Sequence, residues 1–240
     1  MKTKAQSANA SLPAENFKWK FTRNGEMKYL FYLPKDYSAK SGKKWPLLLF
    51  LHGAGERGSD VQRAGIHGPM KLVKQGTNFP FIIIAPQCPE EQLWQNDELI
   101  QLLDHAMKKF GADERRVYLT GLSMGGYGAW SLGMTYPERF AAIAPICGGG
   151  EFITPYLATG EKARALKTLG VWAFHGAKDP SVPVEESQRM VGLLKTLEVK
   201  DVKFTVYPDA QHDSWSETYQ NPELYDWLLK HERPKTRGAK

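Results

Sequence analysis

Residues 118–128 read YLTGLSMGGYG, and the interpretation of the whole chain starts from this stretch. It places Ser123 between Gly121 and Gly125, after an apolar, β-branched run and before a run of small and apolar residues. That order predicts a buried strand, a tight turn and a helix. Because glycine permits close backbone contacts that any Cβ would obstruct, the serine oxygen is expected to project from the end of the sheet.

The pattern G-x-S-x-G is that of a nucleophile elbow, although a serine N-cap beside closely packed glycines gives the same letters. An activated serine also needs a base and an acid, which in this arrangement follow in the order serine, acid, histidine. Asp179 follows the apolar run 171–174, and His212 follows the strand-like run 202–207. Because loops after parallel strands meet at one edge of a sheet, we predict that Ser123, Asp179 and His212 form a catalytic triad.

Other acids and histidines compete for these roles. Asp209 and Asp213 flank His212, but an aspartate so close in sequence usually caps the turn instead. His175 ends a strand and is expected to make a structural hydrogen bond beneath the Asp179 loop. The remaining candidates are His105 in an expected helix, His231 in the charged tail, and His67 in a glycine-rich loop, where it contacts either substrate or solvent.

A second glycine-rich loop predicts the oxyanion hole. The apolar run 46–51 has the composition of a strand buried on both faces, and residues 52–58 read HGAGERG directly after it. A loop in this place supplies one N–H donor, while the residue after the nucleophile supplies the other. We assign the donors to the backbone N–H groups of Ala54 and Met124. His52 is expected to bond nearby backbone, and Glu56 and Arg57 to brace the loop.

Substrate contacts are the least constrained part of the sequence. Trp94 and Trp215 lie in loops on the expected active edge, where an indole either binds a flat aromatic or sugar ring or covers the edge of the core. Gln87 is a further candidate on this edge. No inserted stretch is long enough for a large lid, so an open groove is expected, which favours bulky, polymer-linked or small esters over long buried acyl chains.

Alternating strands and helices predict an α/β fold with a doubly wound, mainly parallel sheet. The 240 residues suit one catalytic domain over 17–232, with a linker-like tail at 1–16 and a basic tail at 233–240. An antiparallel hairpin is expected near the N-terminus. Its strands would be 17–21 and 27–33, around Asn24-Gly25. Other expected strands are 81–85, 116–120 and 140–146, and expected helices are 98–110, 127–134, 184–197 and 222–230.

Composition and charge exclude several other classes of protein. The net charge of +6 is concentrated partly at the termini, without the basic stripe or aromatic platform of a nucleic-acid-binding protein. The apolar runs are shorter than the roughly 20 residues of a membrane helix. Two cysteines, Cys88 and Cys147, are expected to be free thiols, and neither they nor the histidines have the spacing of a zinc site. No cofactor is expected, no signal peptide is evident in the first residues, and oligomeric state and compartment stay open.

Five segments carry a family resemblance: 51–58, 121–126, 144–150, 175–179 and 212–215. Together they resemble the α/β-hydrolase esterases, over a span from about Lys28 to Leu229. Within these, the chain is similar to the group often labelled predicted peptidases, to the feruloyl and acetyl esterases of carbohydrate esterase family 1, and to polyhydroxybutyrate depolymerases. The resemblance implies a serine esterase that acts on short-chain or aryl esters. A serine peptidase or polyester depolymerase of the same fold, and a non-catalytic binding module, are the alternatives.

Overall fold

The computed structural model describes residues 15–16 and 24–235. The strands are β1 (Tyr29–Tyr32), β2 (Trp45–Leu51), β3 (Ile82–Pro86), β4 (Ala112–Leu122), β5 (Ala142–Ile146), β6 (Gly170–Gly176) and β7 (Asp201–Tyr207). The α-helices are α1 (Gly68–Lys74), α2 (Asn96–Phe110), α3 (Met124–Thr135), α4 (Ile153–Tyr156), α5 (Gly160–Thr168), α6 (Val184–Thr196), α7 (Trp215–Gln220) and α8 (Pro222–Leu229). Short 3₁₀ turns are η1 (Ala54–Glu56), η2 (Val61–Gly65) and η3 (Pro137–Arg139).

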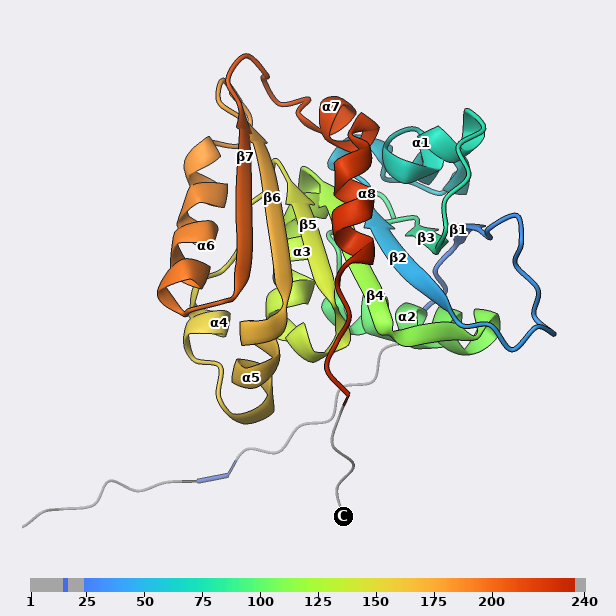
Figure 1. Cartoon of the computed structure of the whole chain (residues 1–240). Helices are drawn as coiled ribbons and strands as arrows, with labels where there is room; N and C mark the ends of the chain where they lie inside the picture. Colours follow the sequence, from blue (N-terminus) through green and yellow to red (C-terminus); the bar gives the residue numbers. More distant parts are fainter. Residues whose placement is uncertain (1–14, 17–23, 236–240) are drawn as a thin grey trace, which may run out of the picture.

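The described strands form one sheet in the order β1-β3-β2-β4-β5-β6-β7 (Figure 1). β1 pairs antiparallel with β3, and all other neighbouring strands are parallel. The loops that follow β2, β4, β5, β6 and β7 therefore leave the sheet at the same edge. This is the predicted α/β-hydrolase arrangement, and it gathers the candidate site at the carboxyl ends of the central strands.

Helices cover both faces of the sheet, so alternate residues of a central strand enter different cores. On β2, Leu47, Leu49 and Leu51 pack in one cluster with side chains of α2, α3 and α6. Leu48 and Phe50 pack on the other face with side chains of α1, α7 and α8. Figure 1 shows α7 and α8 in front of the sheet and α2 and α3 behind it. Burial on both faces explains why this strand reads as a continuous apolar run.

The ends of the chain differ in part from the expectation. The first arm of the expected hairpin, residues 17–21, lies outside the described residues, and the described arm β1 pairs with β3. Arg233, assigned from sequence to the basic tail, is fixed to the body: its N–H donates to Arg115 O at 2.8 Å, and Arg115 Nε donates to Arg233 O at 2.9 Å. Within the described part of the chain, no helix is long and apolar enough to cross a membrane.

Candidate active site

Ser123 lies at the junction of β4 and α3 with φ 52° and ψ −117°, a strained conformation for a residue with a side chain. The glycines around it allow this turn. A Cβ on Gly121 would lie 2.2 Å from Gly125 O, and one on Gly125 would lie 2.0 Å from Leu51 O. The Ser123 N–H donates to Ile146 O at 3.0 Å, which ties the elbow to the end of β5. The backbone is thus locked while the side chain stays free to react.

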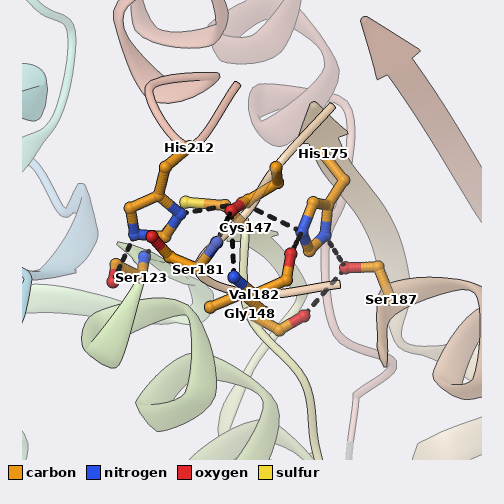
Figure 2. Close-up of polar contacts among 9 residues, drawn as sticks. Ser123, Cys147, Gly148, His175, Ser181, Val182, Ser187 and His212 are labelled. Atoms are coloured by element: carbon orange, nitrogen blue, oxygen red, sulfur yellow. Dashed lines mark hydrogen bonds and ion pairs between the residues drawn. The ribbon is translucent and has the colours of Figure 1, made fainter. Parts of the chain in front are cut away.

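Two loops bring a histidine and an aspartate to this serine (Figure 2). His212 Nε2 lies 2.9 Å from Ser123 Oγ, and His212 Nδ1 lies 2.7 Å from Asp179 Oδ2. A carboxylate only accepts hydrogen bonds, so Nδ1 carries the imidazole proton and Nε2 accepts from the serine hydroxyl. The three residues therefore form a continuous chain of hydrogen bonds in the orientation that proton transfer from Ser123 requires.

The loops that carry Asp179 and His212 are joined by their backbones. Lys178 N–H donates to Ala210 O at 3.0 Å, across the two loops. Gly176 makes this possible, because a Cβ there would lie 2.1 Å from Gln211 O. The relative position of the acid and the histidine is therefore set by main-chain contacts.

Hydrogen bonds keep the Asp179 carboxylate ionised although its side chain is fully buried. Burial alone raises its pKa. Hydrogen bonds from His212 Nδ1 to Oδ2 and from the N–H groups of Val182 and Ser181 to Oδ1, the latter two at 2.9 Å, outweigh burial and lower the pKa below its usual value. The carboxylate is thus negatively charged at neutral pH and holds one tautomer of His212.

The competing acids are bound elsewhere. Asp209 Oδ1 lies 2.7 Å from Lys178 Nζ in an exposed ion pair. Asp213 accepts hydrogen bonds from Ser216 N–H and Ser216 Oγ, both at 2.9 Å, at the start of α7. The structure gives neither carboxylate a hydrogen bond to the imidazole, and the capping role expected from sequence is seen for Asp213.

The glycine-rich loop after β2 lies against the elbow. A Cβ on Gly53 would be 3.6 Å from the Ser123 Cβ and 2.8 Å from Leu122 Cδ1. Ala54 is the first residue of η1, and Met124 is the first residue of α3. N–H groups in the first turn of a helix have no acceptor within the helix, which is compatible with the predicted role of both as oxyanion donors.

Charged side chains hold this loop in shape. Glu56 Oε2 accepts from Gly53 N–H at 3.0 Å, and Arg57 Nε donates to Ala54 O at 3.1 Å. Arg63 Nη2 donates to Gly55 O. Glu56 also lies 3.6 Å from His67 Nε2 through its other oxygen. Glu56 and Arg57 therefore brace the loop, as their sequence context predicted, whereas the contribution of Arg63 has no local sequence signal.

We expect the Glu56→Ala variant to lose about 10-fold or more in kcat, below the ~10²–10³-fold that loss of a whole oxyanion donor costs. The reason is that the buried Gly53 N–H would lose its acceptor and the neighbouring Ala54 N–H would lose its fixed direction. Glu56→Gln keeps an oxygen in place and serves as the matched control, with activity near that of the unchanged protein. Steady-state kinetics on a chromogenic ester measures both, and equal losses in the two variants would contradict the bracing role.

The predicted substrate contacts differ in where they lie. Trp215 packs edge-on against the His212 ring, with 5.3 Å between centroids, and also contacts His67. Trp94 donates from Nε1 to His52 O at 3.2 Å and packs on the His52 ring at 4.8 Å, so it covers the edge of the core beneath the oxyanion loop. Of these two tryptophans, Trp215 is the one whose ring packs against His212.

Gln87 lies at the edge of the sheet that the sequence suggested, but its side chain turns inward. It is 4% exposed, and its Nε2 donates to Glu56 O at 2.7 Å and to Cys88 O at 3.0 Å. The Gln87 amide therefore holds the loop after β3 against the loop after β2, and its contact with substrate stays a prediction. Sequence position alone gave the correct edge of the sheet but not the direction of the side chain.

His52 is structural. It is 1% exposed, its Nδ1 donates to Gly53 O at 2.7 Å, and its Nε2 accepts from Cys88 N–H at 3.0 Å. Burial lowers its pKa, which keeps the ring neutral and suits this donor and acceptor pattern. The ring thus connects the ends of β2 and β3.

Both cysteines are free and buried. Cys147 Sγ accepts from the Ser123 N–H at 3.3 Å, so a thiol lies directly beside the serine. Burial raises the pKa of Cys147 to about 12 and that of Cys88 to about 11. Only the thiolate is a good nucleophile, so neither thiol competes with Ser123 at neutral pH. Within residues 15–16 and 24–235, no three His, Cys, Asp or Glu side chains gather as a metal site would require.

Known proteins place this geometry in a family. A family model described as phospholipase/carboxylesterase matches residues 90–225, more than half of the chain and a span that contains Ser123, Asp179 and His212. The chain belongs to the phospholipase/carboxylesterase family. This is a family of carboxylesterase-type hydrolases.

Relatives of this carboxylesterase-family hydrolase include two curated enzymes. It is 25% identical over 214 residues to a bifunctional acetylxylan esterase/xylanase of Neocallimastix patriciarum. That match covers 82% of this chain and 27% of the relative. It is 25% identical over 139 residues to feruloyl esterase B of Talaromyces stipitatus, covering 52% of this chain and 36% of that protein. The chain thus spans well under half the length of either relative.

Among solved structures, a thermostable esterase superposes with a TM-score of 0.71 at 33% identity. The match covers 86% of this chain and 60% of that chain. The similarity supports the α/β-hydrolase fold.

Proposed function

We propose that the chain is a serine carboxylic-ester hydrolase that acts through an acyl-enzyme on short-chain or aryl esters, including acetyl or feruloyl groups linked to polysaccharide. The observation that carries the proposal is the hydrogen-bonded series Ser123 Oγ, His212 Nε2 at 2.9 Å, and Asp179 Oδ2 at 2.7 Å from His212 Nδ1. A non-catalytic module would not need to keep the strained serine, its base and a buried carboxylate in this hydrogen-bonded arrangement.

In the proposed reaction, His212 takes the proton of Ser123 as Oγ attacks the ester carbonyl. Asp179 stabilises the imidazolium that forms, and the N–H groups of Ala54 and Met124 donate to the oxyanion. His212 then protonates the leaving alcohol. Water deacylates the enzyme by the same steps, with His212 as the base.

The substrate class is supported by the relatives and by the surface. One curated relative is named an acetylxylan esterase and another a feruloyl esterase. A groove of about 510 Å³ borders the loop after β2. It is lined by Glu26, Lys28, Gly58, Ser59, Asp60, Arg63, Gln87, Pro89 and Glu90. Five of these nine residues are charged, which suits a hydrophilic alcohol portion better than a long acyl chain.

Burst kinetics with p-nitrophenyl acetate, butyrate and a longer-chain ester, run beside methyl ferulate, test the proposal. We expect a burst equal to the enzyme concentration on the short esters or on the ferulate, because acylation would release the alcohol before water attacks. Serine-dependent turnover confined to peptide amides or to insoluble polyester would replace the proposed substrate class. The absence of serine-dependent turnover on every ester would refute the esterase.

A further inference from the structure

A second histidine contacts the carboxylate of Asp179. His175, on β6, is fully buried, and Figure 2 shows its ring between Val182 and Ser187. Its Nε2 lies 3.3 Å from Asp179 Oδ2, the same oxygen that bonds His212. The proposed mechanism makes no use of this ring.

The partners of His175 Nε2 require a proton on that nitrogen. It lies 2.9 Å from Val182 O in addition to the 3.3 Å contact with Asp179 Oδ2. A carbonyl oxygen and a carboxylate oxygen only accept hydrogen bonds. Nε2 is therefore the donor to both.

The partners of His175 Nδ1 require a second proton. Nδ1 lies 2.8 Å from Ser187 Oγ, and Ser187 Oγ donates to Gly148 O at 2.8 Å. The serine hydroxyl has one hydrogen, and the Gly148 carbonyl can only accept it. If that hydrogen pointed at Nδ1 instead, two oxygen atoms would face each other at 2.8 Å with none between them. The arrangement that satisfies both contacts has Nδ1 donating to Ser187.

We propose that His175 is a buried imidazolium, doubly protonated, which shares the Asp179 carboxylate with His212 and tunes the pH range in which His212 acts as a base. The inference depends on the proposed function for its catalytic consequence but not for the charge itself. Buried charges persist when they are paired and hydrogen-bonded, and the side chains of His175 and Asp179 are both fully buried in direct contact. His175 is thus a positioning residue that acts through Asp179.

Other ionisable groups near the pair do not supply or cancel this charge. Burial, with a further contribution from Glu186, raises the pKa of Tyr127 on α3, and burial raises the pKa of Cys147 after β5 to about 12, so both stay neutral. On α6, Glu186 is paired with Arg189 at 3.0 Å. Asp179 is therefore the residue that provides the negative charge opposite His175.

A positive charge on His175, which contacts the same Asp179 carboxylate, disfavours a second positive charge on His212. The free enzyme therefore keeps His212 neutral, and active, to lower pH than Asp179 alone would allow. Replacing His175 by glutamine removes the charge and keeps an amide that can donate to Val182 O. We expect the acidic limb of kcat/KM to move to higher pH by about one unit. Ser187→Ala, which removes the acceptor for Nδ1–H, is expected to move it in the same direction.

Histidine-labelled ¹⁵N NMR of the whole chain measures the charge without any catalysis. At about pH 8, above the ordinary histidine pKa of about 6.5, the resonances lost in His175→Gln should show protons on both ring nitrogens. A single proton on His175 there would overturn the proposal even if the protein hydrolyses esters. Conversely, a doubly protonated His175 in a protein without esterase activity would leave the charge intact and refute only the proposed function.

The pH profiles test the coupling to His212 separately. Glu186→Gln is the matched control, since it removes a charge next to Ser187 on α6 without touching the buried pair, and its acidic limb should not move. A purely structural His175 would lower activity at every pH and leave the limb unmoved in both folded variants, which would overturn the tuning. If His175→Gln does not fold, the imidazole resonances that shift in Ser187→Ala identify His175, and its protonation in the unchanged chain together with the pH profile of Ser187→Ala decides the question.

Discussion

The Ser123→Ala variant should lose about 10⁶-fold in kcat on any ester that the unchanged protein hydrolyses. Without Oγ no acyl-enzyme can form, and the imidazole 2.9 Å away has no hydroxyl to deprotonate. Alanine also carries a Cβ, so the strain at φ 52° is already present in the native turn. The free energy of unfolding should therefore change by less than about 1 kcal/mol.

Active-site titration and steady-state kinetics, with denaturant unfolding alongside, measure this result. Ser131→Ala on the exposed side of α3 is the matched control, and it should retain full activity because the Ser131 hydroxyl accepts from Asn96 Nδ2 at 3.0 Å and has no bond to Ser123, His212 or Asp179 in the structure. Turnover of Ser123→Ala equal to that of the control would refute the assignment. The adjacent Cys147 thiol would then be the next candidate nucleophile, despite its raised pKa of about 12.

The order of strands explains why sequence reasoning reached the candidate triad. Ser123, Asp179 and His212 lie in loops after three parallel strands. The loops that follow parallel strands lie at the same edge of the sheet, and this depends on strand direction and not on the side chains. The elbow glycines add a local requirement that is readable in the sequence, because a Cβ at Gly121 or Gly125 would collide with backbone.

Side-chain directions within those loops were not predictable in the same way. Gln87 follows β3 at the correct edge, yet its amide turns inward to bond Glu56 O, a contact 31 residues away that no local pattern encodes. The Trp94 indole likewise turns toward His52, a contact that no local pattern encodes. The partners of His175 come from the Asp179 loop and from α6, so its hydrogen-bond inventory becomes visible only when these segments are brought together.

Asp179→Asn should reduce kcat/KM by about 10⁴-fold. Two backbone N–H groups, of Ser181 and Val182, donate to Oδ1, so the amide oxygen of the asparagine must take that position. Its NH₂ group then faces His212 Nδ1, where the carboxylate oxygen had accepted a hydrogen bond at 2.7 Å. A donor at that place favours the tautomer with the proton on Nε2, which points at Ser123 and cannot take its proton.

The control for this variant is Asp213→Asn, because Asp213 is next to His212 in sequence but caps Ser216. Its kcat/KM should stay within a few-fold of the unchanged protein, while α7 is slightly destabilised by the weaker cap, at about 1 kcal/mol or less. A large loss in Asp213→Asn together with a small loss in Asp179→Asn would transfer the orienting role to Asp213. The amide also removes the counter-charge of the proposed His175 imidazolium, so denaturant unfolding measured alongside should show Asp179→Asn destabilised, whereas a neutral His175 predicts little change in stability.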